Sequence, residues 1–176
     1  GDAIQQEIDN YHVKDGDVIE VHPGTYNPID FNGKNITIRA VYASGSNRPV
    51  IDGGGNVPCV TFNGTEDRRA SLVGFRLVNG SNSSGYGGGV ACNGAKVNIV
   101  DNEIVNCSAT HGGAVGYCSG LVDLNILGES GAGNIAQYGG AAAFGTATYR
   151  RNKIENNYAW YGGAFYNLGY TILEDG

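Results

Sequence analysis

Two stretches of the chain carry the same pattern, NEIVNCSATHGGA at residues 102–114 and NKIENNYAWYGGA at residues 152–164. Seven positions agree at identical spacing, although the two stretches begin fifty residues apart. This agreement indicates a single structural unit that is repeated, with a further copy between the two.

The Gly-Gly doublet extends the pattern along the chain. It begins at residues 87, 112, 139 and 162, in steps of 25, 27 and 23 residues. A repeat of this length is typical of a stacked array in which each unit buries its apolar side chains against its neighbours. We expect the asparagines of the pattern, Asn102 with Asn152 and Asn106 with Asn156, to form columns whose amides bond from coil to coil.

Short apolar alternations identify each unit as a winding of β-strands. Apolar residues recur at every second position and are interrupted by Gly, Asn and Ser, as in Val97-x-Ile99, Phe75-x-Leu77 and Val122-x-Leu124-x-Ile126. A period of two favours strands, and the Gly and Asn clusters favour turns. Two or three such strands in each repeat predict one coil of a parallel β-helix, whose strands pair with those of the next coil.

The N-terminal segment is expected to cover the first coil. Residues 2–11 favour a short amphipathic helix with Asp2 as N-cap and with Ile4, Ile8 and Tyr11 on one apolar face. An uncovered solenoid end would expose strand edges and core. We therefore expect a single β-helix domain over residues 1–176, in which residues 1–12 form the cap and residues 13–176 the coils. The C-terminal coil is expected to be uncapped and to contact a second copy of the chain, which would give a homo-oligomer.

Several runs of sequence resemble a known family. DGDVIEVHPGTY at residues 15–26, NGKNITI at 32–38, VIDGG at 50–54 and LVGFRLVNG at 72–80 are similar to the opening coils of proteins of the pectate-lyase-like superfamily. The Gly-Gly-Ala coils are similar to the repeats of bacterial polymorphic outer-membrane and surface proteins. The resemblance implies an all-β, single-stranded, right-handed parallel β-helix, and the chain length divided by the period predicts about six or seven coils. Such folds serve lyases, hydrolases, esterases and adhesins, so the resemblance does not select an activity.

Composition excludes some functions. The net charge is −6, and the only basic pairs are Arg68-Arg69 and Arg150-Arg151, which argues against a nucleic-acid partner. The chain contains no run of 18 apolar residues, so we expect no membrane span. We expect a bacterial protein that is extracellular or attached to the cell surface.

The four cysteines leave two interpretations open. Their spacings match no zinc site, and we predict no metal site. Cys92 and Cys118 follow their glycine doublets at similar distances and would approach each other on adjacent coils, where they would form a disulfide. The other interpretation, which we favour at this point, is that all four are buried thiols.

The residue before each doublet is aromatic. These residues are Tyr86, His111, Tyr138 and Tyr161, and stacked coils would place their rings in a ladder with a spacing of about 4.8 Å. With Trp160 beside them they would form a flat platform for sugar rings. The competing interpretation is a purely structural stack, in which His111 is one of the rings and not a base.

Acidic residues are the candidates for catalysis. Asp101 and Glu103 share one face of a predicted strand, and Asp67 with Arg68 combines an acid and a guanidinium in one loop. Polysaccharide hydrolysis requires two carboxylates, and elimination requires a base together with a cation. Any Ca²⁺ belongs to this lyase alternative only; otherwise no cofactor is expected.

We therefore predict a non-catalytic, secreted or cell-surface β-helix domain that binds a polysaccharide or surface glycan, or serves adhesion. The first alternative is a polysaccharide lyase or glycoside hydrolase, and the second is a structural spacer.

Overall fold

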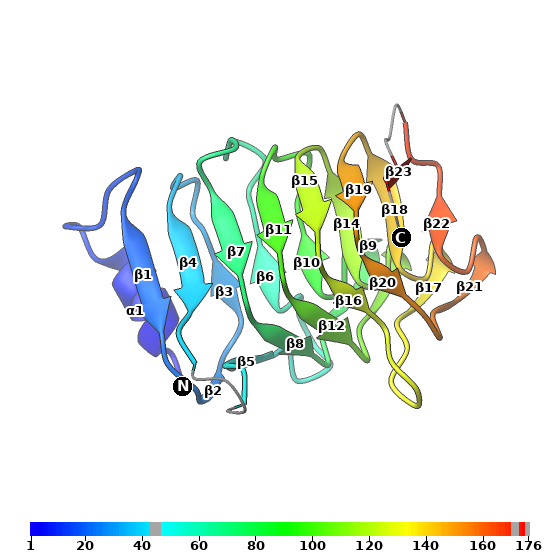
Figure 1. The fold of residues 1–176 in the computed structure, drawn as a ribbon, viewed down its shortest axis with the longest axis horizontal. Coiled ribbons are helices and arrows are strands. Elements are labelled where there is room, and N and C mark those ends of the chain that lie inside the picture. Colours follow the sequence, from blue (N-terminus) through cyan, green and yellow to red (C-terminus); the bar gives the residue numbers. More distant parts are fainter. Residues whose placement is uncertain (43–46, 170–172, 175–176) are drawn as a thin grey trace.

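Figure 1 shows the protein as a row of stacked coils with one short helix at the N-terminal end. The computed structural model describes residues 1–42, 47–169 and 173–174. All strand pairs are parallel, and each strand pairs with its equivalents in the adjacent coils. The predicted right-handed parallel β-helix is confirmed.

The strands form four sheets, which we name A to D and which each coil crosses in the order A, B, D, C. Sheet A has seven strands: β1 (Val18–Val21), β4 (Thr37–Ala40), β7 (Ser71–Val73), β11 (Asn98–Val100), β15 (Leu121–Asp123), β19 (Thr148–Arg150) and β23 (Leu173–Glu174). Sheet B has six: β2 (Thr25–Tyr26), β5 (Val50–Asp52), β8 (Arg76–Val78), β12 (Glu103–Val105), β16 (Ile126–Leu127) and β20 (Lys153–Ile154).

Sheet C also has six strands: β3 (Ile29–Asp30), β6 (Val60–Thr61), β10 (Val90–Ala91), β14 (Val115–Cys118), β18 (Ala142–Gly145) and β22 (Phe165–Tyr166). Sheet D occurs only in the later coils and has four: β9 (Ser81–Tyr86), β13 (Ser108–His111), β17 (Ile135–Tyr138) and β21 (Tyr158–Tyr161). Six stacked strands are separated by five steps, so sheets B and C advance through about five turns. The count is slightly below the predicted six or seven, because the N-terminal helix and the loops use residues without adding coils.

The helix α1 (Ala3–Asp9) lies at the first coil, as predicted, and buries Ile4 and Ile8. Asp2 occupies the N-cap position, as predicted, but its carboxylate accepts from the side chain of Asn27 and makes no capping hydrogen bond. The predicted place of Tyr11 on the apolar face is wrong. Tyr11 is 75% exposed, because the helix ends before its ring can join the apolar face.

The corner between sheets A and B is made by one residue in the left-handed region. Asp101, Leu124 and Arg151 have φ between +51° and +58° at this position. The expected alternation through Leu124 is therefore interrupted, and two short strands meet there at an angle. The next residue in each coil is a buried asparagine, and these three form the predicted column of amides, Asn102, Asn125 and Asn152.

The second predicted asparagine column is shifted by one residue. Asn106 and Asn156 both adopt positive φ at the corner that leads out of sheet B. The Asn106 amide bonds to Asn79 of the preceding coil at 2.6 Å. The buried amide column comes from the following position, where Asn134 and Asn157 are hydrogen-bonded at 2.9 Å. The corner residue supplies the turn, and its neighbour points into the coil.

Buried aliphatic and phenylalanine side chains fill the interior of the coils; the bulkiest are Phe31, Phe62, Phe75, Ile36, Ile38, Ile51, Leu72, Leu77, Ile99, Ile104 and Leu127. In the described part of the chain no helix is long and apolar enough to cross a membrane. The predicted open C-terminal end includes residues 170–172 and 175–176, which lie outside the described residues.

Candidate functional site

The glycine doublets lie over one another along the stack. The amide of Gly113 donates to the carbonyl of Gly139 at 3.2 Å, and the amide of Gly140 donates to that of Gly162 at 3.1 Å. The first glycine of each doublet has φ between +64° and +77°, a conformation that glycine adopts without strain. This repeated turn brings the preceding aromatic residue to the same corner in four coils.

The four residues before the doublets form the predicted column. Successive ring centroids from Tyr86 through His111 and Tyr138 to Tyr161 are 4.7, 5.1 and 5.1 Å apart. The interplanar angles are 22°, 13° and 11°, so the rings stack face to face. The predicted ladder and the place of His111 as one of its rings are confirmed.

The orientation of the rings limits what the column offers to a ligand. A sugar ring stacks on a free aromatic face. The faces of His111 and Tyr138 are covered by the rings on either side, and His111 Nδ1 is buried without a hydrogen-bond partner among the described residues. These contacts stabilise the corner. Tyr161 ends the column and is 56% exposed, and ligand binding by the column stays a prediction.

A second set of rings supports the column from sheet C. Phe144 meets Tyr86 and His111 edge-on, at 5.2 and 5.1 Å, and Tyr166 packs against Tyr138 at 4.9 Å. Phe144 and Tyr117 both have φ near +55°, which is uncommon for a bulky residue. This set was not predicted, although Tyr117 and Phe144 each lie five residues after the first glycine of a doublet.

The outer face of sheet D is a different surface from the column. Strand register places Ser108, Ile135 and Tyr158 in one row across the sheet. Side chains alternate along a strand, so the residue two positions on faces the same way. A second outward row therefore contains Thr110, Gln137 and Trp160, while the alanine between the two rows faces inward.

This face, which we call the sheet D face, exposes large apolar side chains. Ile135 is 53%, Tyr158 60% and Trp160 69% exposed. Monomeric proteins seldom leave such side chains clustered at the surface, and clusters of this kind mark binding surfaces. Trp160, predicted to lie beside the column, directly precedes Tyr161 in β21 and has its side chain on the sheet D face with that of Tyr158, which was not predicted.

The structure places Asp101 and Glu103 in a cluster of ion pairs over sheets A and B. Arg48 bonds to Asp101 at 2.9 Å and to Glu103 at 3.1 Å, and Arg76 bonds to Glu103 at 2.8 Å. Arg76 also pairs with Glu129, which holds the pKa of that carboxyl below its usual value.

The cluster borders a shallow hollow lined by Tyr42, Asn47, Arg48, Val50, Arg76 and Glu103. Three acids and two arginines on one face are the combination that a polysaccharide-cleaving enzyme would require. Each acid, however, is already bonded to an arginine. The Arg76–Glu103 bond joins successive coils, and the bonds of Arg48 to Glu103 and of Arg76 to Glu129 each pass over one intervening coil. The ion pairs of the cluster therefore link coils to one another, and each of its three carboxylates already has a cationic partner.

Asp67 and Arg68 are not part of that cluster. The Asp67 carboxylate bonds to Arg69 at 2.8 Å, and this hydrogen bond lowers its pKa. The side chain of Arg68 is exposed, and its backbone carbonyl accepts a bond from Asn98. Within the described residues, no ion pair joins either of them to Asp101 or Glu103.

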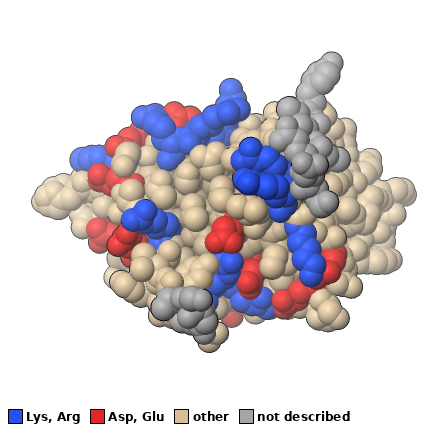
Figure 2. Space-filling view, in the orientation of Figure 1, with Lys and Arg blue, Asp and Glu red and all other residues tan. Residues whose placement is uncertain are grey.

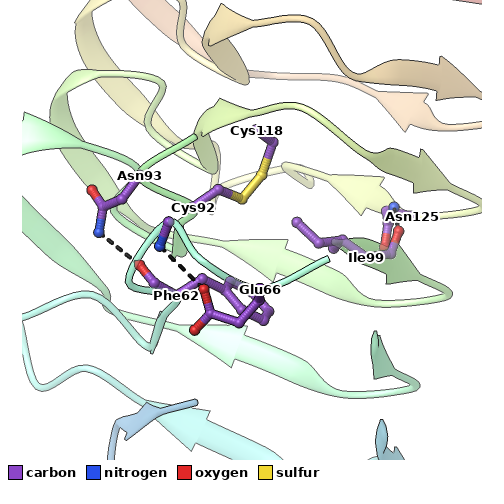
Figure 3. Close-up of a disulfide and its surroundings, with 8 residues drawn as sticks. Phe62, Glu66, Cys92, Asn93, Ile99, Cys118 and Asn125 are labelled. Atoms are coloured by element: carbon purple, nitrogen blue, oxygen red, sulfur yellow. Dashed lines mark hydrogen bonds between the residues drawn. A yellow bond between two sulfur atoms is a disulfide. The ribbon is translucent and has the colours of Figure 1, made fainter. Parts of the chain in front are cut away.

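Cys92 and Cys118 form a disulfide between adjacent coils (Figure 3). Their Cα atoms are 5.0 Å apart, within the range that a disulfide spans. The expectation that all four cysteines are thiols is therefore wrong, because strand stacking brings these two positions together inside the coil. Cys59 and Cys107 remain buried thiols, and the neighbouring Cys107 thiol, together with burial, raises the pKa of Cys59.

Among the described residues, no group of three or more His, Cys, Asp or Glu side chains is arranged to hold a metal ion. Comparison of the chain with protein-family models, curated proteins and solved structures found no match. The assignment of a function therefore depends on the geometry of the surfaces described above.

Proposed function

We propose that this β-helix is a non-catalytic glycan-binding or adhesion domain and that the sheet D face is its binding surface. The observation that carries the proposal is the pair Tyr158 and Trp160, two largely exposed aromatic side chains on the same face of one strand. Aromatic faces take up the apolar faces of sugar rings, and their exposure without a partner is otherwise unfavourable.

Neighbouring polar groups support the same function. Gln137 lies beside Trp160 in the adjacent strand, and Ser108 and Thr110 lie one strand further along. The Gln137 amide can both donate to and accept from a sugar hydroxyl. The hydroxyls of Thr110 and Ser108 donate to Ser83 and Ser81 of the preceding coil and can still accept a hydrogen bond from a sugar. The rigid stack of coils holds these groups in fixed positions, which lowers the entropy cost of binding.

The disulfide supports an extracellular or cell-surface location for this domain. Disulfides persist in oxidising compartments and are rare in reducing ones.

Binding to a glycan array, by wild type and by a Tyr158→Ala/Trp160→Ala double variant, tests the proposal. We expect wild type to bind at least one glycan class and the double variant to lose about tenfold or more in affinity, because two stacking contacts are removed. Tyr11→Ala is the matched control, since Tyr11 is 75% exposed at the N-terminal end. Equal binding by all three proteins, or no binding by wild type, would contradict the proposal.

The second candidate is a polysaccharide lyase or hydrolase, whose acids and arginines would be those of the ion-pair cluster over sheets A and B. A reducing-end assay and an assay for unsaturated products, run on the glycans that bind, separate the two. Release of product that depends on Glu103 would replace the binding function by an enzymatic one.

A further inference from the structure

The four strands of sheet D contain no Asp, Glu, Lys or Arg. Among the described residues, the charged side chains belong to α1, to strands of the other sheets and to the loops. In Figure 2 they occupy the left and centre of the view, while the right-hand end, where β21 and β22 lie in Figure 1, is free of them. The one histidine in these strands, His111, is enclosed between two tyrosine rings.

The absence of charge restricts the chemistry of a ligand on this face. A carboxylate or sulfate brought against Tyr158 and Trp160 would lose water without gaining a cationic partner, which is costly. The chain as a whole carries a net charge of −6, which repels a polyanion at longer range. Both effects act against uronic-acid polymers and sulfated glycans.

The groups that are present suit an uncharged ligand. Two aromatic rings lie two residues apart on β21, about 7 Å along the strand. In the neighbouring strands, the Gln137 amide can donate and accept hydrogen bonds, and the Thr110 hydroxyl, which donates to Ser83, can accept one. A chain of neutral sugars can place its apolar faces on the rings and its hydroxyls against these groups at the same time.

We infer that the ligand class of the sheet D face is a neutral polysaccharide. The inference depends on the proposed glycan-binding function and specifies its ligand. The sheet D face and the ion-pair cluster over sheets A and B therefore differ in the ligands they suit. At the cluster, a charged ligand would have to compete with arginine–carboxylate bonds already in place.

The test measures the affinity of the intact chain for a neutral polysaccharide and for a polyuronate of similar length, at low and high salt. We expect binding to the neutral polymer that does not change with salt, and binding to the polyuronate at least about tenfold weaker. The Tyr158→Ala/Trp160→Ala double variant should bind the neutral polymer about tenfold or more weakly than wild type does. Tyr11→Ala again serves as the control.

Charge substitutions at Gln137 make the test sharper, because Gln137→Glu preserves the size of the side chain and adds only charge. We expect Gln137→Glu to leave the polyuronate unbound and Gln137→Lys to increase its binding by attraction. Tighter binding of wild type to the polyuronate, or equal binding to both polymers, overturns the inference but leaves the glycan-binding proposal standing. Binding to neither polymer nor to any array glycan overturns both.

Discussion

Asn125 is the side chain whose loss should most clearly show how the coils are held together. Its Oδ1 accepts from the backbone amide of Asn102 at 2.9 Å and from the Asn102 side chain at 3.2 Å. Its Nδ2 donates to the carbonyl of Ile99 at 2.9 Å and to Oδ1 of Asn152 at 3.0 Å. One buried amide therefore connects three successive coils.

Replacing Asn125 by alanine removes all four bonds and leaves the buried backbone N–H of Asn102 without an acceptor, while the Asn102 side chain keeps its bond to the carbonyl of Leu72. An unpaired buried donor costs about 1–3 kcal/mol, and each further lost bond about 0.5–1.5 kcal/mol. We expect the free energy of unfolding to fall by roughly 3–5 kcal/mol. For a chain of this size, the loss corresponds to a decrease of roughly 10 °C in the midpoint of thermal unfolding.

Thermal unfolding followed by circular dichroism measures the effect. Asn98→Ala is the matched control, because the Asn98 amide bonds to Arg68 and Ser71 at the surface of sheet A, where water can replace it. We expect the control to lose less than about 1 kcal/mol. Asn125→Asp keeps the size and the acceptor but removes both donors, so it should also be destabilised. If Asn125→Ala unfolds at the same temperature as Asn98→Ala, the amide column does not hold the coils together.

Three further effects are expected on stability. The Cys92–Cys118 disulfide closes a loop over 26 positions, and its removal should lower the free energy of unfolding by about 3 kcal/mol. A reductant should lower the midpoint of thermal unfolding of wild type but not that of a Cys92→Ala/Cys118→Ala variant. Two arginines lower the pKa of Asp123 from 3.8 to about 2, so the ionised carboxylate should contribute up to about 2 kcal/mol to the free energy of unfolding. This contribution is present above pH 4 and is lost as the pH falls towards 2. The stability of Asp123→Asn, measured over the same pH range, should lack this part of the pH dependence. Gly113→Ala would bring a Cβ to 2.5 Å from a carbonyl oxygen of the next coil and should cost about 1–3 kcal/mol. The equivalent Gly163→Ala, whose nearest atom is at 3.6 Å, should change the unfolding midpoint little, and equal effects of the two would refute the packing argument.

The stacked coils and the aromatic column could be predicted from the sequence because both depend on a period. A glycine doublet every 23 to 27 residues places the turns, and the residue before each doublet then falls at one corner. Strand spacing sets the distance between rings, so the separations near 5 Å follow from the same period. The asparagine column that includes Asn102 and Asn152 could be predicted for the same reason.

Other features were decided by contacts between coils that no local pattern encodes. Arg48 meets Glu103 across 55 positions of sequence only because each coil has a particular length. The offsets from the glycine doublets predicted that Cys92 and Cys118 would approach each other, but they did not decide between a disulfide and two thiols. The face-to-face orientation of the rings depends on side-chain packing, since sheet spacing alone also permits rings that lie in one plane. The sheet D face depends on the fold in the same way. Strand alternation puts Tyr158 and Trp160 on one side of β21, and the winding of the coil makes that side the outer one. The sequence alone determined the repeat, and only the tertiary structure decided which side chains share a surface.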